Sequence, residues 1–319
     1  MAEAQRESDH EVAAWDEEET LAPMRQRLWV LYRGYWLKHQ TAESVRLLEA
    51  QFEPRPDDLF LVTYPKSGTT WLKALAFAVA NRQRHAAGSD GHPLLTNHPQ
   101  DLVPFLELPD RRVHPVAGLD ALASPRLLCT HMPVALLPPR VSALGCQVVY
   151  LCREPKDVLV SYWHFASKVH PDFTLDKAFQ LFCQGVSSYG PIWEHYLGYW
   201  RQSLMEPHKI LFLKYDDMMA DPVSHVKTLA KFLRVPFSDD EVRRGVVEAL
   251  VDLCSFDKLK SLQVNSSGVS DRIAGVPIEN SSYFRAGKVG DWATHLTPEM
   301  AKKLDDIVEE KMRGSGLKF

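Results

Sequence analysis

Four short apolar runs, each followed directly by polar residues, constrain the fold of this chain more than any other feature. The runs are Leu59 to Thr63, Arg126 to Thr130, Gln147 to Cys152 and Ile210 to Tyr215. They are nearly continuously apolar rather than alternating, which is typical of strands in a parallel sheet covered on both faces. Helical patterns separate them, so we predict an α/β fold with a central parallel sheet flanked by helices.

Other segments have the periodicity or the capping residues of helices. They are Thr70 to Arg82, Lys156 to Lys168, Val223 to Leu233, Asp239 to Val251, and a final helix that Thr297 caps and Pro298 begins. Residues 265–290 are rich in Ser and Gly, so we expect a long functional loop there. No linker divides the chain, which predicts a single domain over residues 1–319, with residues 1–20 as a flexible acidic tail.

Composition excludes several classes of protein. A formal net charge of -4 leaves no basic footprint for nucleic acid or an acidic membrane surface. Neither a signal peptide, a transit peptide nor a run long enough to span a bilayer is present, so we expect a cytoplasmic protein. The five cysteines include no Cys-x-x-Cys pair and are expected to be reduced thiols. The 13 histidines form no metal-binding pattern, so we expect no metal.

The polar clusters that follow the four runs should converge. Ligands of an open parallel sheet bind beyond the carboxyl ends of its strands. The clusters at these ends are Pro65 to Trp71, Thr130 to Pro133, Arg153 to Pro155 and Tyr215 to Asp217. We therefore predict that all four open onto one crevice.

The first cluster has the composition of an anion-binding loop. Gly68 permits close approach of the backbone, while Ser67, Thr69 and Thr70 offer hydroxyl donors and Lys66 adds a full charge. The lysine precedes the glycine, so the segment lacks the order of the common triphosphate-binding loop. The plainer interpretation is a strand-to-helix turn with a few hydroxyl groups.

Two long signatures resemble those of the soluble sulfotransferases. They are Tyr64 to Trp71 and Phe284 to Trp292. Thr130 to Pro133 and Arg153 to Asp157 also match in the same order, and Pro104 to Glu107 is similar to the plant-type branch. The resemblance runs from about residue 52 to the end. It implies a P-loop-like nucleotide-binding fold and a metal-free enzyme whose donor is 3′-phosphoadenylyl sulfate and whose nucleotide product is adenosine 3′,5′-bisphosphate (PAP).

The resemblance also assigns residues to parts of that donor. Lys66 to Thr70 would hold the 5′-phosphosulfate, and Trp71 would stack on the adenine. The remaining assignments are Arg153 and Ser161 on the 3′-phosphate, Tyr215 and the segment Cys254, Ser255 and Phe256 near the adenine, and Arg285, Ala286 and Gly287 closing over the 3′-phosphate. Each has a plainer alternative: Trp71 as a core aromatic, Arg153 in a surface ion pair, and Ser161 as an ordinary helix residue.

The resemblance implies in-line transfer of a sulfuryl group to a hydroxyl. His131 would be the general base, suited by a pKa near neutrality, and Lys66 would stabilise the departing phosphate. A histidine alone is more often a hydrogen-bonded core residue, but His131 directly follows a predicted strand. A nucleotide-dependent small-molecule kinase and a non-catalytic nucleotide sensor are the alternative functions.

The chain departs from the family pattern at three places. Ala286 stands where the second signature usually has Lys, which removes a cation near the 3′-phosphate. Cys129 stands where many animal members carry Lys. The stretch after Trp292 lacks the dimerisation motif of animal members, so we expect a monomer, with a weak homodimer as the alternative.

The acceptor is less well specified than the donor. Phe105, Trp163, Phe165 and Tyr189 are candidates for an apolar pocket above His131, with Phe165 the strongest by family position and core packing the competing explanation. Such a pocket suits a small phenol, flavonoid, steroid-like alcohol or hydroxylated hormone.

Overall fold

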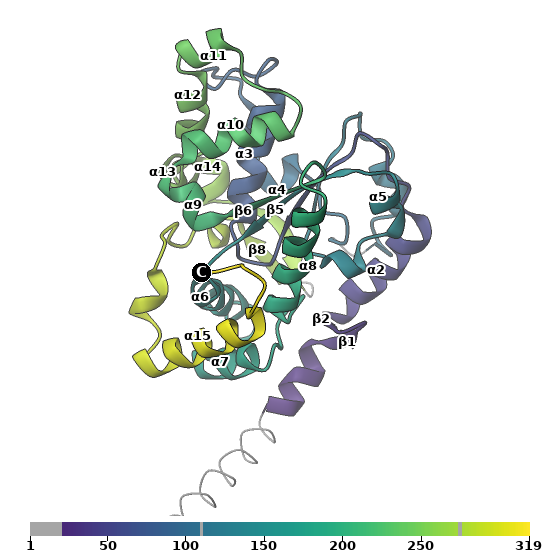
Figure 1. Cartoon of the computed structure of the whole chain (residues 1–319), viewed down its shortest axis with the longest axis vertical. Coiled ribbons are helices and arrows are strands. Elements are labelled where there is room, and N and C mark those ends of the chain that lie inside the picture. The colour runs from purple at the N-terminus through teal and green to yellow at the C-terminus, as the bar shows by residue number, and fades with distance from the viewer. Residues whose placement is uncertain (1–20, 109–110, 274–275) are drawn as a thin grey trace, which may run out of the picture.

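The centre of the molecule is a parallel sheet of four strands (Figure 1). The structure is a computed structural model that describes residues 21–108, 111–273 and 276–319, so the acidic tail over residues 1–20 lies outside the described part. The strands are β3 (Leu59–Thr63), β4 (Leu127–Thr130), β5 (Gln147–Cys152) and β6 (Ile210–Lys214), in the order β4-β3-β5-β6. The predicted α/β class and parallel sheet are confirmed.

Strand order places a ligand-binding crevice at the carboxyl end of β3. This strand pairs with β4 on one side and with β5 on the other. The chain therefore passes from β3 to its neighbour on one side and then crosses to β5 on the other side. Every residue of β3 and β5 is buried, which explains why both strands are continuously apolar in sequence. The crevice of an open α/β sheet lies where the strand order reverses, just beyond the strand ends.

Helices cover both faces of the sheet. One face packs on α3 (Thr69–Asn81), α10 (Pro222–Phe232) and α12 (Val246–Leu253), in a core that includes Val149 and Leu151 of β5. The alternate residues Val148 and Tyr150 belong to the opposite core. That second core includes side chains of α2 (His39–Gln51), α6 (Pro155–Ala166), α7 (Leu175–Cys183), α8 (Ile192–Met205) and α15 (Pro298–Met312).

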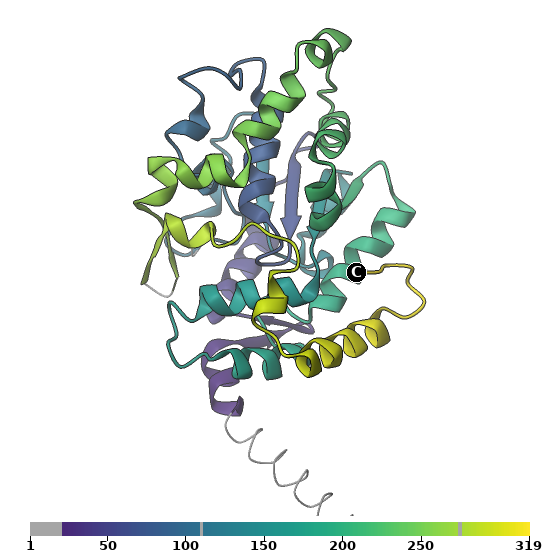
Figure 2. The same ribbon diagram turned by 90° about the vertical axis from the view of Figure 1, so that its left-hand side faces the viewer.

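The C-terminal helix returns to the lower part of the molecule. In both views α15 lies beside α6 and α7 (Figures 1 and 2). Its start is as the sequence indicates, because the Thr297 side chain accepts a hydrogen bond from the Met300 amide and Pro298 occupies the first turn. This packing holds the C-terminal segment close to α6, which borders the crevice.

Two predicted segments differ from the structure. Residues 239–251 form two helices rather than one, α11 (Asp239–Arg243) and α12, because the chain turns at Gly245, whose φ of 71° is left-handed. The loop expected over residues 265–290 is wrong in part. It contains an antiparallel hairpin of β7 (Val269–Ile273) and β8 (Val276–Glu279), followed by the 3₁₀ turn η4 (Asn280–Tyr283).

The remaining elements are short. They are the hairpin β1 (Val30–Tyr32) and β2 (Tyr35–Leu37), the helices α4 (Pro99–Leu102), α5 (Pro139–Ala143), α9 (Tyr215–Ala220), α13 (Phe256–Ser261) and α14 (Gln263–Ser266), and the 3₁₀ turns η1 (Pro93–Leu95), η2 (Val116–Leu119), η3 (Val134–Leu136) and η5 (Asp291–Thr294). No helix in the described part of the chain combines the length and apolarity that crossing a membrane requires. All five cysteines are free thiols.

Candidate functional site

A cavity of about 850 Å³ opens at the carboxyl edge of the sheet. Residues after β3, β4, β5 and β6 line it, so the predicted convergence of the four polar clusters is observed. Its lining includes most of the residues expected from the sequence: Lys66, Gly68, Thr69, Thr70, Trp71, Phe105, His131, Arg153, Ser161, Phe165, Tyr215, Ser255, Phe256, Arg285, Ala286 and Gly287. Ser67 and Cys254 do not line it, because both are fully buried behind its wall.

The loop between β3 and α3 has an unusual backbone. Lys66 has a φ of 70° and Gly68 a φ of 103°, both in the left-handed region. A Cβ atom on Gly68 would lie 2.7 Å from the Tyr215 ring, so only glycine fits. Helix α3 begins at Thr69 without a side-chain cap and without an acidic residue in its first turn. Its first amides are therefore left to bind an anion, as the helix dipole favours.

Lys66 is the most perturbed cation of the cavity. Burial, together with repulsion from Arg285, Lys168 and Arg153, lowers the pKa of its ammonium group to about 7. Its Nζ lies 4.0 Å from the centroid of the Phe165 ring. We call Lys66, Arg153, Lys168 and Arg285 the cationic end of the cavity. Four like charges raise the cost of an empty cavity, and a bound anion would relieve that repulsion.

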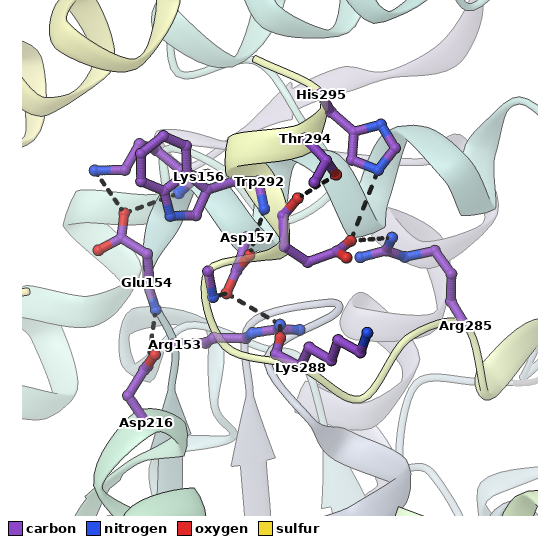
Figure 3. Close-up of polar contacts among 12 residues, drawn as sticks. Arg153, Glu154, Lys156, Asp157, Asp216, Arg285, Lys288, Trp292, Thr294 and His295 are labelled. Atoms are coloured by element: carbon purple, nitrogen blue, oxygen red, sulfur yellow. Dashed lines mark hydrogen bonds and ion pairs between the residues drawn. The ribbon is translucent and has the colours of Figure 1, made fainter. Parts of the chain in front are cut away.

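Arg153 and Arg285 are held by the protein but not saturated (Figure 3). The Nη2 atom of Arg153 donates to the Lys288 carbonyl at 2.6 Å and to Asp157 at 3.2 Å, and Nη1 of Arg285 donates to Asp291. The Nε atoms of both arginines are buried and have no hydrogen-bond partner. A buried donor without a partner costs free energy, so each arginine keeps a donor available for a ligand.

Asp157 fixes the C-terminal segment over the cationic end. It is fully buried on α6 and accepts hydrogen bonds from the amides of Gly290 and Trp292, at 2.9 and 3.0 Å, as well as from Arg153 (Figure 3). One carboxylate therefore ties the strand-end arginine to the segment that carries Arg285. The sequence offered an ion pair of Arg153 with Glu154 or Asp157 only as a surface alternative, whereas the observed pair with Asp157 is buried.

Aromatic rings form the wall beside the cationic end. Trp71 and Tyr215 meet edge to face, with ring centroids 5.4 Å apart, and the Arg153 guanidinium lies 4.5 Å from the Tyr215 ring centroid. A Cβ atom on Gly287 would lie 2.4 Å from the Phe256 ring, so glycine is required where these two segments meet. This wall has the flat apolar surfaces that a nucleobase can stack against.

His131 is held in one tautomer. Its Nδ1 lies 2.7 Å from the Thr63 carbonyl oxygen, so Nδ1 carries the proton and donates it, leaving the lone pair on Nε2. Burial lowers the pKa of His131, and although the hydrogen bond to Thr63 opposes the shift, repulsion from Lys73, His195 and Lys66 helps to bring the pKa to about 3. The expected pKa near neutrality is therefore wrong for the ligand-free protein, in which His131 is neutral and can accept a proton.

A hydrogen-bond network fixes the backbone around His131. Glu107 is fully buried and accepts from the His131 amide at 2.7 Å, the Thr130 hydroxyl at 2.8 Å and the Tyr189 hydroxyl at 2.9 Å. His195 Nε2 donates to the His131 carbonyl at 2.9 Å. The sequence did not reveal the roles of Glu107 and His195. The only signal was the place of Glu107 in a matched motif, two residues after Phe105, and His195 had none.

We call Phe105, Glu107, His131 and Tyr189 the histidine end of the cavity. The ring centroids of Phe105 and Tyr189 lie 4.9 and 5.5 Å from that of His131. Trp163 does not line the cavity and packs instead on His164 and His295. Lys38 and His170 also line the cavity. The histidine end thus combines one fixed imidazole with aromatic walls.

The described residues contain no group of three or more histidine, cysteine or acidic side chains that could hold a metal ion. The charges that face the cavity are mostly cations, which repel metals and attract anions.

Comparison with known proteins gives a consistent result. A family profile described as the sulfotransferase domain matches residues 56–316. Cytosolic sulfotransferase 15 of Arabidopsis thaliana is 43% identical over 301 residues, which cover 92% of this chain and 83% of that protein. Flavonol 4′-sulfotransferase of Flaveria chlorifolia is 42% identical over 290 residues, which cover 90% of this chain and 88% of that protein.

A solved structure agrees with the sequence matches. The mouse sulfotransferase SULT7A1 complexed with PAP superposes with a TM-score of 0.68 and 26% identity, covering 90% of this chain and 95% of that chain.

Proposed function

The chain belongs to the sulfotransferase family, and on that premise we propose that its cavity binds 3′-phosphoadenylyl sulfate and passes the sulfuryl group to a hydroxyl of a small, largely apolar acceptor. His131 is the general base and Lys66 stabilises the leaving phosphate. Family membership decides against the kinase alternative, and the relatives named as enzymes argue against a sensor.

The cationic end carries this proposal. Arg153 and Arg285 each have a buried Nε donor without a partner, and burial together with the neighbouring cations lowers the pKa of Lys66 to about 7. A nucleotide with phosphate groups at both ends of its ribose satisfies these donors and neutralises these charges. Lys66 to Thr70 would hold the 5′-phosphosulfate, and Arg153, Ser161 and Arg285 the 3′-phosphate.

The adenine fits the aromatic wall beside those arginines. Trp71, Tyr215 and Phe256 line the cavity, and Ser255 caps α13, which begins at Phe256. Cys254 lies fully buried behind them, so its part in the donor site is through packing rather than contact. Gly287 admits the Phe256 ring, and this contact joins the adenine wall to the segment that covers the 3′-phosphate.

At the histidine end, Nε2 of His131 takes the proton of the acceptor hydroxyl. The Thr63 carbonyl keeps the other ring nitrogen protonated, so the lone pair has a fixed position. An oxygen–sulfur bond forms to the acceptor while the bond from sulfur to the phosphate oxygen breaks. The negative charges of the donor raise the basicity of His131, which burial otherwise keeps low.

Lys66 acts on the other partner of the transfer. Its ammonium group stabilises charge on the departing 5′-phosphate, together with the free amides at the start of α3. Lys66 has a left-handed φ and lines the cavity. An anion beside it returns its pKa toward the ordinary value for lysine and so keeps the ammonium charged.

The acceptor class follows from the histidine end. Phe105 and Tyr189 lie close to His131, and Phe165 lies under Lys66, so aromatic rings offer flat surfaces to a planar aromatic alcohol. One relative is named for a flavonol, which is a phenol of this shape. We expect phenols and flavonoids to be better acceptors than linear alcohols, with steroid-like alcohols between them.

Two measurements test the proposal. In a thermal-shift assay PAP should stabilise the protein more than ATP does, because only PAP carries a 3′-phosphate. In a direct product assay, labelled sulfate should move from 3′-phosphoadenylyl sulfate to members of a panel of phenols, flavonols and steroids. Equal stabilisation by ATP and PAP, with no labelled product from any acceptor, would refute the proposed function.

We further propose a cytoplasmic enzyme that works as a monomeric single domain. The curated relatives include proteins named cytosolic sulfotransferases. Size-exclusion chromatography with light scattering, at micromolar concentration, should give the mass of one chain, 36.3 kDa. Twice that mass would favour the homodimer instead.

A further inference from the structure

One histidine of the cavity has an unexplained buried nitrogen. Seven buried side-chain nitrogen or oxygen atoms in the described part of the chain lack a hydrogen-bond partner. Three of the seven belong to residues that line the cavity: Arg153 Nε, Arg285 Nε and His164 Nε2. The two arginines already have a proposed ligand. His164 has none, although it lines the cavity together with both arginines and its Nε2 lacks a partner.

His164 lies on the face of α6 that the 3′-phosphate would meet. It follows Ser161 by three residues, and side chains at that spacing are neighbours on one face of a helix. Both residues line the cavity. The ring is held by Trp163, at a centroid distance of 4.2 Å, and by His295, at 4.9 Å. The imidazole therefore has a fixed place beside a residue already proposed to bind phosphate.

Charged groups face His164 from three directions. Arg285 and Asp291 approach from the C-terminal segment, His295 from the start of the turn toward α15, and Lys168 from beyond the end of α6. Asp291 is shared with other groups, because Arg285 donates to it and His295 Nε2 lies 3.7 Å from it (Figure 3). The surroundings of the imidazole are thus mainly cationic, and they favour an anion as its partner.

We propose that His164 is a further ligand of the 3′-phosphate of the donor and that it takes the place of the cation missing at Ala286. The inference rests on the proposed donor. Ala286 follows Arg285 directly and lines the same cavity, but its methyl group offers no donor. An imidazole N–H on α6 restores one hydrogen bond to the phosphate, and it becomes charge-assisted when the imidazole is protonated.

Calorimetric titration of the full chain with PAP and with AMP tests this assignment. AMP lacks the 3′-phosphate, so the ratio of the two affinities isolates contacts to that group. Replacing His164 with phenylalanine (His164→Phe) should reduce the preference for PAP about tenfold and leave AMP binding unchanged. His164→Gln keeps an N–H donor and should retain more of the preference.

A matched control is His170→Phe, because His170 lines the same cavity but faces Lys38 and Arg27 rather than Arg285. It should leave the ratio of PAP to AMP affinity unchanged. In the His164→Phe background, Ala286→Lys should restore the preference for PAP. Thermal unfolding of each variant shows that it is folded before its affinities are compared.

Two results would overturn the assignment. One is an unchanged affinity ratio in His164→Phe, and the other is an equal loss for PAP and AMP, which would make His164 a packing residue. These failures are distinct from failure of the proposed function. If the unmodified protein itself showed no preference for PAP over AMP, the 3′-phosphate site as a whole would be absent.

Discussion

The two ends of the cavity are built in opposite ways. At the cationic end, Lys66, Arg153, Lys168 and Arg285 lie close enough to depress the pKa of Lys66, and two arginine Nε atoms have no partner. At the histidine end, Glu107 accepts three hydrogen bonds and both sides of His131 are fixed by backbone contacts. The cationic end has unsatisfied hydrogen-bond donors until an anion binds. The hydrogen bonds of the histidine end are already made, and they leave a single lone pair, on Nε2 of His131.

This difference assigns separate tasks to the two ends. An end with unsatisfied donors gains free energy when a phosphate arrives, so it accounts for binding. An end whose hydrogen bonds are already made needs no rearrangement to act, so it accounts for proton transfer in a fixed geometry. Variants at the two ends should therefore fail in different ways.

The largest effect is expected at the histidine end. His131→Ala removes the base and should lower kcat by about 10³- to 10⁴-fold. The measurement is labelled product formed per enzyme at saturating donor and acceptor. Phe105→Leu is a control at the same end, since it alters the wall without removing the base. Turnover in His131→Ala close to that of the unmodified protein would remove His131 from the chemistry.

The next effect concerns the charge at the cationic end. Lys66→Met keeps the length of the side chain but removes its charge, so the leaving phosphate loses its main stabilising group. We expect the single-turnover rate to fall about 10²- to 10³-fold. Lys66→Arg, which keeps the charge, should lose less. An equal loss in both variants would mean that shape rather than charge matters at this position.

A third effect tests the network behind His131. Glu107→Ala leaves three buried donors without an acceptor and should lower the free energy of unfolding by about 3 kcal/mol. Urea denaturation measures this change. Glu107→Gln keeps one acceptor oxygen and should cost less. If the alanine variant unfolds at the same urea concentration as the unmodified protein, the network does not fix the histidine end.

The smallest effect is a pH dependence of binding. In the ligand-free protein the pKa of Lys66 is lowered to about 7, and a bound phosphate raises it. Above pH 7 free Lys66 has lost its proton, and binding must take one up. PAP affinity should therefore fall between pH 7 and 9, by no more in total than the loss of about tenfold expected when the Lys66 charge is removed. Calorimetry in Lys66→Met should show a flatter profile, and an equally steep one would exclude Lys66 as the titrating group.

The sequence predicted one end of the cavity far better than the other. The residues of the cationic end lie in contiguous motifs after strands, where charge and glycine are visible in the sequence. The histidine end depends on Thr63, Glu107 and His195, which are far apart in the chain and meet only in the folded protein. The depressed pKa of His131 likewise follows from burial, which its sequence neighbours do not reveal.

The fold shows the same pattern. The bounds of β3 and β5 were predictable because both strands are buried on both faces and read as continuous apolar runs. The hairpin of β7 and β8 was not, because its segment is polar and resembles a loop in composition. Gly245 ends α11 by its left-handed backbone, and an amphipathic pattern continues across that break.

The central claim is that the cationic end binds the donor and the histidine end transfers the proton. It is tested most directly by measuring the affinity for PAP in two variants side by side. His131→Ala should bind PAP as tightly as the unmodified protein, while Lys66→Met should bind it about tenfold more weakly. Calorimetric titration at pH 7 gives both dissociation constants. If His131→Ala loses as much affinity as Lys66→Met, binding and proton transfer are not separated between the two ends.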